Sequence, residues 1–432
     1  MFVVLLAVVI MTGPTPSYPY VASRTPSPDD SAVAGASASS RAGIAGLTAP
    51  EALTRWAADG WRQQRTPGAY EWWHFDAIDA AGNGVVIALY DGFCFHSKYL
   101  SEIRRFHWRM HKRDLSGIRG QVLPTFYPAA YVAVFQGGRC AARFFNMYPP
   151  GSFKGCTDWP EFQVGPNRVT LRQDGSFGIS VRGYPSHITP AGPRHRRDQS
   201  LIADLTFVPS FPTVQHSGAF RPDGADGAHH EWIVAAPHGA VTGRVQHLDM
   251  RENLMLLDFP VNTLGFHDHH VGGSGIGRGM KRFTRGRALG DDWAVVWNVA
   301  SGLEAGAVAC DKILIFQKGA EPIILDHPRT EIRQTRLTRS LVRYPCQMTM
   351  HGSDTRGNTV ELLLSHRHVM ETTPFSVRTS CAMQMRLPGK RQFVGRGMME
   401  TNAVHNLTLP IISDVAIRSI VQIEPDDPLW RQ

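Results

Sequence analysis

The stretch RVTLRQDGSFGISVRGY, residues 168–184, decides the fold of this chain. Apolar residues occupy every second position on both sides of Asp174-Gly175, a dipeptide typical of turns. Successive side chains of a strand point to opposite faces, so this period of two places the apolar residues on one face. The segment therefore predicts a half-buried β-hairpin.

The same alternation recurs along most of the chain. Strand-like runs cover residues 85–90, 131–135, 201–208, 231–235, 293–300, 312–317, 359–370 and 375–387. Turn-forming residues separate them, and amphipathic helical patterns are nearly absent, with 49–61 the best candidate. Many short strands with frequent turns predict an all-β protein of antiparallel barrels or sandwiches.

The length of 432 residues predicts more than one domain, because single all-β domains rarely exceed roughly 250 residues. We expect an apolar run and a disordered linker over 1–50, an N-terminal domain over 51–305 and a C-terminal domain over 306–432. The run at 1–11 is shorter than the roughly 20 residues that span a bilayer, so no stable membrane span is expected. It resembles part of a signal peptide, which leaves export and a cytoplasmic location both open.

Composition narrows the function classes. The net charge is +8, but the basic residues are scattered singly and in pairs, so no nucleic-acid partner is expected. The six cysteines form no C-x-x-C pair, which excludes zinc-ribbon and thioredoxin-like sites. The chain carries no P-loop, dinucleotide or G-x-S-x-G motif in a suitable context, and we expect no cofactor.

Three motifs in this order resemble the carotenoid 1,2-hydratase (hydroxyneurosporene synthase) family and its lipocalin-like relatives. They are YEWWHFDA at 70–77, HEWIV at 230–234 and GFHDHH at 265–270. The resemblance covers most of residues 65–410 and implies two lipocalin-like β-barrel domains in tandem with an apolar pocket. It also implies an isoprenoid or polyketide-like ligand, since the superfamily includes hydratases of acyclic carotenoids and relatives that steer cyclisations of natural products.

The chain departs from the pattern of the hydratases at two places. Where they commonly carry His-Asp-His-Asn-Trp-Gly, this chain has HDHHVG at 267–272. Where they carry Tyr-x-Asp in a later strand, it has Val296-Trp297-Asn298. The acid that the resemblance implies for protonating an alkene is therefore an amide, Asn298.

Asp268 is the acid that remains in the central motif. A carboxyl group in an apolar pocket keeps its proton to higher pH, so we predict Asp268 as the proton donor, with His267 and His269 as relay partners. Glu71, flanked by aromatic residues, is the next candidate. On this hypothesis Asp268→Asn abolishes turnover and preserves ligand binding, whereas a purely structural polar network would make the variant unfold.

Aromatic, histidine and amide residues near these motifs are the candidates for substrate binding. They are Trp72, Trp73, His74, Trp232, His270, Trp297 and Asn298. Paired tryptophans are more often core packing, and a lone amide is more often a satisfied core residue. The histidines could hold zinc or iron, but their spacing matches no dedicated metal motif, so we expect no metal.

The sequence thus predicts acid–base catalysis on an apolar natural product: hydration, dehydration, isomerisation or cyclisation. The alternative is a non-catalytic lipocalin-like carrier. The amide at Asn298 favours the carrier, whereas the acid–histidine cluster around Asp268 favours the enzyme.

Overall fold

The computed structural model describes residues 56–112, 122–189, 192–211, 217–220, 229–273, 275–276, 280–302, 311–354, 357, 359–387, 392–409, 412, 418 and 420–430. The apolar run and linker predicted over 1–50 lie outside the described residues. So does most of the helix expected over 49–61, where the described part contains the 3₁₀ turn η2, Ala57–Asp59. In the described part of the chain, no helix is both long and apolar enough to cross a bilayer.

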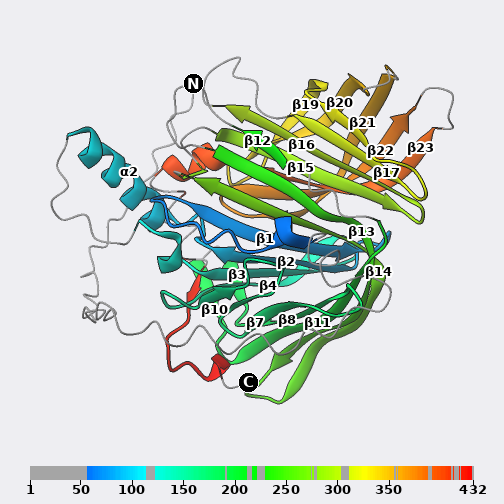
Figure 1. Cartoon of the computed structure of the whole chain (residues 1–432). Helices are drawn as coiled ribbons and strands as arrows, with labels where there is room; N and C mark the ends of the chain where they lie inside the picture. The colour runs from blue at the N-terminus through cyan, green and yellow to red at the C-terminus, as the bar shows by residue number, and fades with distance from the viewer. Residues whose placement is uncertain are drawn as a thin grey trace, which may run out of the picture. The chain divides into compact units, whose positions relative to one another are not determined.

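The larger sheet has the strand order β24-β4-β3-β2-β1-β14-β13-β11-β8-β7-β6-β5, with β12 beside β13 (Figure 1). All of its strand pairs are antiparallel except β24 with β4. In this order its strands are Val421–Gln422, Arg139–Met147, Ala129–Gln136, Gly84–Asp91, Tyr70–Ile78, Leu254–Gly273, His229–Asp249, Gln199–Pro209, Phe177–Gly183, Asn167–Leu171, Phe162–Val164, Phe153–Gly155 and, for β12, Ser217–Phe220.

The smaller sheet is antiparallel, in the order β18-β17-β16-β15-β23-β22-β21-β20-β19. In this order its strands are Ile323–Asp326, Lys312–Gln317, Trp293–Gly302, Met280–Gly290, Phe393–Asn402, Ser376–Arg386, Thr359–Thr372, Arg343–Ser353 and Arg329–Leu337. A separate ribbon pairs β9, Ser186–Thr189, with β10, Gly192–His195. The remaining 3₁₀ turns are Pro124–Phe126, Val404–Thr408 and Pro428–Trp430. The chain passes from the larger to the smaller sheet between β14 and β15; the domain boundary near residue 305 stays a prediction.

The prediction of an all-β protein with two large, almost entirely antiparallel sheets is confirmed. The hairpin over 168–184 forms as β7 and β8, with Leu171 opposite Phe177. Each sheet curls around its own core. Phe144 of β4 and Phe153 of β5, near opposite ends of the larger sheet, belong to one hydrophobic cluster. In the smaller sheet, Trp297 of β16 and Met348 of β20 likewise belong to one hydrophobic cluster.

The face of the larger sheet that points away from its own core packs against the smaller sheet. Trp232 and Phe266 share a cluster with Val296 of β16, and Phe135 shares one with Met398 of β23. Residues that alternate along β1 and β14 therefore lie in two environments, the core of the larger sheet and the layer between the two sheets.

One helix, α2, Ser97–His111, follows β2 and extends away from the sheets (Figure 1). We expected amphipathic helical patterns to be nearly absent, so this helix was not predicted. Its N-cap is His96, whose side chain accepts a hydrogen bond from the Tyr99 backbone N–H. Tyr99 and Ile103 bury against the sheets, and this burial holds the first half of the helix in place.

Candidate active site

Strands β1 and β14 lie side by side and bring the first and third motifs together. Their register sets Trp73 opposite His269, and His74 opposite Asp268. Since side chains alternate between faces, the predicted catalytic residues fall into two clusters. His267, His269 and Glu71 face the core of the larger sheet, whereas Asp268 faces the layer between the sheets.

The core-side cluster is a buried polar network. His267 Nε2 lies 2.8 Å from Asp59 Oδ2, and its Nδ1 donates to the His74 carbonyl oxygen at 2.9 Å. His269 Nε2 lies 2.9 Å from Glu71 Oε1, which also accepts from the Arg62 backbone N–H at 2.9 Å. Burial raises the pKa of Glu71 well above its ordinary value and lowers that of His269 to about 4. A protonated Glu71 and a neutral His269 therefore satisfy each other inside the core.

Asp268 lies in a different electrostatic setting. Arg285 Nη1 of β15 donates to both carboxylate oxygens at 2.7 Å, and Trp232 Nε1 donates at 2.8 Å. His270 Nε2 lies 3.1 Å away. Burial opposes ionisation, but the Arg285 charge and the His270 contact outweigh it, and the pKa of Asp268 lies well below its ordinary range. This ionised acceptor does not fit the proton-donor role that we predicted for Asp268.

His74 is the titratable group best placed to react. Its Nδ1 lies 3.2 Å from Asp268 Oδ1, and neither ring nitrogen makes a well-aligned hydrogen bond within the described part of the chain. Burial and the nearby Arg285 charge lower its pKa, so the imidazole is neutral. A buried polar atom without a partner is rare and calls for an explanation. His74 thus presents an open imidazole nitrogen with an ionised carboxylate beside the ring.

A row of three spaces lies between the two sheets. The first is an aromatic cavity of about 50 Å³, bordered by rings that include Tyr90, Phe95 and Phe375. A gap of about 10 Å³ beside Asp268 shares His74, Arg285 and Glu400 with that cavity. The gap in turn shares Arg287 and Met398 with an open groove of about 880 Å³. His74 thus lies where the aromatic cavity meets the gap.

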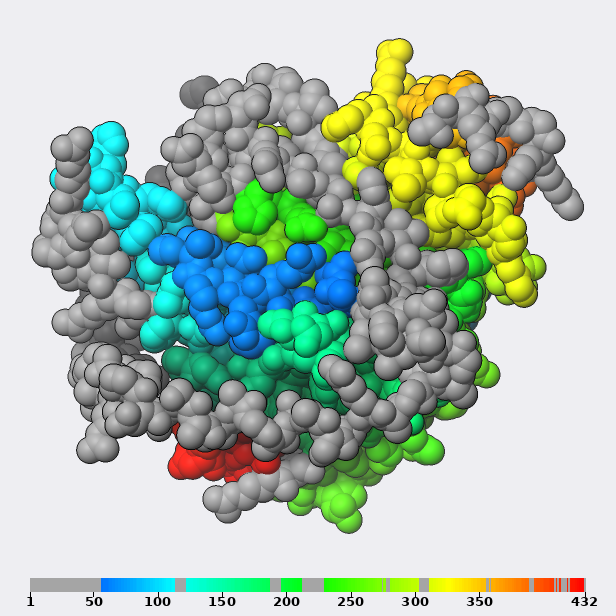
Figure 2. Space-filling model, in the orientation of Figure 1, coloured from blue at the N-terminus to red at the C-terminus, as the bar shows by residue number. Residues whose placement is uncertain are grey.

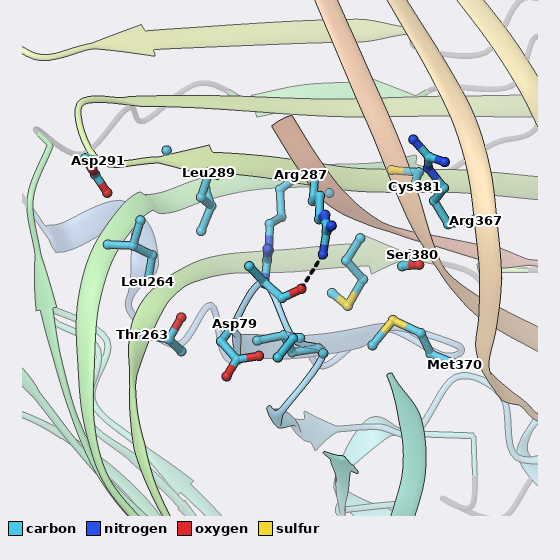
Figure 3. A pocket seen from close by; sticks show the side chains of 18 of the residues that line it. Asp79, Thr263, Leu264, Arg287, Leu289, Asp291, Arg367, Met370, Ser380 and Cys381 are labelled. Carbon is cyan, nitrogen blue, oxygen red and sulfur yellow. Dashed lines mark hydrogen bonds between the residues drawn. The ribbon is translucent and has the colours of Figure 1, made fainter. Parts of the chain in front are cut away.

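The groove mixes charged and apolar side chains from both sheets. Figure 3 shows Thr263 and Leu264 of β14 on one side and Arg367 and Met370 of β21 on the other. The Arg287 guanidinium, on the border toward Asp268, binds Asp76 of β1, with Nε 2.8 Å from Oδ1. The groove is the largest of the three spaces, but His74 and Asp268 do not line it.

The predicted substrate-binding residues divide between the same two environments. Trp232 lines the gap together with His74, and its Nε1 donates to Asp268. His270 contacts Asp268 from behind this lining, and Trp72 stacks on His270 at 4.3 Å between ring centroids. Trp73 stacks on His269 at 4.5 Å in the core of the larger sheet, and Trp297 lies in the core of the smaller one. Neither of these two reaches the inter-sheet layer.

Asn298 lies opposite Arg285 in the register of β15 and β16. Its side-chain oxygen is buried and has no hydrogen-bond partner among the described residues. The family resemblance implies an acid at this position. The amide of Asn298 instead places a polar but uncharged side chain beside Arg285.

The smaller sheet contributes charged residues to the site that the sequence motifs did not predict. Arg285 Nη2 lies 3.2 Å from Glu400 Oε2, and Arg378 joins Glu400 at 3.1 Å and Glu371 at 2.6 Å. Burial opposes ionisation of Glu400, but the two arginines outweigh it and hold its pKa well below the ordinary range. One sequence feature could have predicted them: Arg285 and Arg287 stand at alternate positions of a strand-like run. Among the described residues, no three histidine, cysteine or carboxylate side chains are grouped to hold a metal ion.

The chain is similar to a curated protein from Chlorobaculum tepidum named hydroxyneurosporene dehydrogenase. The two are 25% identical over 362 residues, which cover 79% of this chain and 84% of that protein. This similarity confirms the resemblance that the motifs predicted. No known family profile matches the chain.

Three solved structures are distantly similar. A protein from Nitrosomonas europaea, provisionally described as an AttH, is 12% identical over 78% of this chain and 93% of its own, with a TM-score of 0.49. CghA with Sch210972 is 10% identical over 79% and 89%, with a TM-score of 0.44. Kievitone hydratase from Nectria haematococca is 11% identical over 78% and 89%, with a TM-score of 0.41. Likenesses this weak carry no argument about the reaction.

Proposed function

We propose that this protein catalyses an acid–base reaction on an apolar natural product and that His74 is its proton-transferring residue. The observation that carries the proposal is the neutral His74 imidazole, whose Nε2 has no partner among the described residues and which borders the inter-sheet cavities. The ionised Asp268, 3.2 Å from Nδ1, stabilises the imidazolium that forms when His74 accepts a proton. Arg285 acts as a positioning residue that orients Asp268.

The charges around His74 favour a reaction that begins with proton removal. Asp268 and Glu400 are both held ionised by arginines, so neither can protonate an unactivated alkene. A neutral histidine instead removes a proton from the carbon next to a carbonyl group or from a hydroxyl group. The imidazolium then returns this proton to another carbon, or to a departing hydroxide that leaves as water. Dehydration, isomerisation or cyclisation of an oxygenated isoprenoid or polyketide-like molecule therefore fits better than hydration of a hydrocarbon. The amide at Asn298 agrees with this choice.

The three spaces suggest how such a substrate is held. The aromatic cavity accommodates only the reacting end, since its volume corresponds to roughly a few waters. The rest of the molecule would extend past Phe95 and Phe375, whose stacked rings lie 4.8 Å apart at the border of this cavity. The open groove on the opposite side, past Arg287, supplies or receives water.

The alternative function is a carrier that binds the same apolar ligand without changing it. The lack of a protonated carboxyl group beside His74 in the described inter-sheet layer favours this reading. The two functions can be distinguished by the molecule that stays bound when His74 is replaced. An enzyme would then hold its substrate instead of its product, whereas a carrier would hold the same ligand as before.

The test is to purify wild-type protein and His74→Ala from cells that make the substrate, and to identify the bound molecules by solvent extraction and mass spectrometry. We expect the product with wild type and the substrate with His74→Ala, which differ by one water for dehydration or in retention time for isomerisation or cyclisation. His351→Ala, a half-exposed histidine of β20, is the matched control and should behave as wild type. The same molecule in all three proteins would establish the carrier instead.

A further inference from the structure

Helix α2 is amphipathic, but only its first half has a partner in the sheets. Tyr99 and Ile103 are 0% and 2% exposed, and Phe106 and Met110 continue the same stripe at helical spacing. Met110 is 47% exposed. Phe106 and Met110 thus belong to none of the hydrophobic clusters that the described residues of the two sheets form. Figure 2 shows the helix as the cyan segment at the edge of the described part of the molecule.

The other side of α2 is strongly basic. The helix and the residue after it carry Lys98, Arg104, Arg105, Arg109 and Lys112. The helix contains a single acid, Glu102, which pairs with Arg105 at 2.6 Å. This is the most basic helix in the described part of the chain, in a protein whose cations are otherwise dispersed.

A tryptophan lies in the middle of this basic side. Arg104, Trp108 and Lys112 follow one another at intervals of four residues and so share one helix face. Trp108 is 60% exposed, more than any other large aromatic side chain among the described residues. Exposing this much of an indole ring to water is unfavourable.

We propose that α2 binds the surface of a bilayer that contains anionic phospholipids. Tryptophan is enriched at the membrane–water interface, where its indole lies at the headgroup level, and the basic residues around Trp108 would attract anionic headgroups. Each basic residue near an anionic surface contributes about 1 kcal/mol. Duplex nucleic acid is the less suitable partner, because its phosphate backbone would leave the Trp108 indole in water, whereas the interface accepts it.

The position of α2 next to the aromatic cavity suggests a function for its binding to a bilayer. Phe93 and Phe95 border the aromatic cavity, and α2 begins at Ser97, directly after them. A bilayer at α2 would bring a reservoir of apolar molecules to the cavity beside His74. This use rests on the proposed function, whereas the binding of α2 to lipid does not.

The first experiment is co-sedimentation of the full chain with vesicles of phosphatidylcholine, alone or mixed with phosphatidylglycerol. We expect binding to the mixed vesicles, weakened by salt, and a loss of at least about tenfold in affinity for Arg104→Glu/Arg105→Glu. The matched control is Arg333→Glu/Arg336→Glu, on the exposed strand β19, which changes the net charge equally. It should keep the wild-type affinity. No binding by wild type, or an equal loss in the control, would overturn the proposal.

The second experiment locates the contact. Brominated phospholipids in the same vesicles should quench tryptophan fluorescence of the wild type, and Trp108→Phe should lose most of that quenching while its thermal melt stays unchanged. Quenching that persists in Trp108→Phe would place the contact elsewhere and overturn the assignment to α2. Binding of wild type to duplex RNA but not to vesicles, lost in Arg104→Glu/Arg105→Glu, would assign α2 to nucleic acid instead. Neither result depends on whether His74 is catalytic.

Discussion

Two carboxyl groups in this protein are equally buried and yet have opposite protonation states. Glu71 and Asp268 are both 0% exposed. Glu71 accepts from a backbone N–H and faces a neutral histidine, so burial dominates and it keeps its proton. Asp268 faces the guanidinium of Arg285, which more than offsets burial. The residue that decides between acid and anion is thus the arginine, supplied by a different sheet.

This difference makes Glu71→Gln a nearly silent substitution. A protonated carboxyl and an amide have the same shape, and both can donate to His269 Nε2 while accepting from the Arg62 N–H. We expect the free energy of unfolding, measured by urea titration, to change by less than about 1 kcal/mol, with turnover retained. Glu71→Ala should cost about 1–3 kcal/mol, because it leaves buried donors and acceptors unpaired.

The contrary result for Glu71→Gln is as informative. A variant that folds with wild-type stability but has lost turnover would show that Glu71 donates a proton in the reaction, as its aromatic neighbours in the sequence suggest. The core-side network would then be part of the active site, and His74 would lose its primary role.

The sequence predicted part of this site, and physical reasons limit the rest. The alternation of side chains within YEWWHFDA and GFHDHH is enough to separate Glu71 from His74, and Asp268 from His267. The alternation does not tell which face of the strand lines a cavity, because that depends on the smaller sheet, which packs against one face. Asp268 was therefore assigned as a proton donor without Arg285, which approaches from β15.

At the scale of elements, the two long strands β13 and β14 connect the hairpins of the larger sheet to the inter-sheet layer. One position of β13 cannot accommodate a side chain. Gly243 has a φ of +149°, and a Cβ there would lie 2.1 Å from the Asp204 carbonyl oxygen of β11. The pairing of β11 with β13 continues without a break through this position.

Gly243→Ala should therefore destabilise the protein. We expect the free energy of unfolding to fall by about 1–3 kcal/mol, because the added methyl group forces β13 away from β11. Gly137→Ala is the matched control: its φ is +54°, but a Cβ there meets nothing within 4 Å. Thermal melts of the two variants separate backbone strain from steric clash. Equal losses would show that the close approach to Asp204 contributes nothing.

The strand-like runs could be predicted because each covers five or more residues, whereas short strands such as β5 and β6, of three residues each, and the helix α2 could not. Its N-cap is His96 rather than the serine, threonine, aspartate or asparagine that usually signals a helix start. Its apolar stripe has only four residues, and half of the helix does not pack on the sheets. The features that hid α2 from the sequence analysis are the ones that suggest a membrane surface.

At the scale of the whole molecule, burial has left many histidines neutral. Those with a lowered pKa are His74, His96, His230, His238, His269, His270 and His366. Fewer carboxyl groups have a raised pKa among the described residues, namely Glu71, Asp91 and Asp311. Within about pH 4 to 6.5, these histidines bind fewer protons in the folded chain than in the unfolded chain, because their pKa values are lowered, whereas these carboxyl groups bind more, because theirs are raised.

The histidines outnumber the carboxyl groups, so in this window the unfolded chain binds more protons than the folded one, and the free energy of unfolding must fall as the pH is lowered from about 6.5 toward 4. The ionised Asp268 and Glu400 act in the same direction at still lower pH, because their pKa values are depressed. Urea titrations at a series of pH values check this, and each net proton gives a slope of about 1.4 kcal/mol per pH unit. A midpoint that stays constant or rises on acidification would mean that the histidine rings already carry protons in the folded state. His74 could then not serve as the base, because its Nε2 would have no lone pair to accept a proton from the substrate.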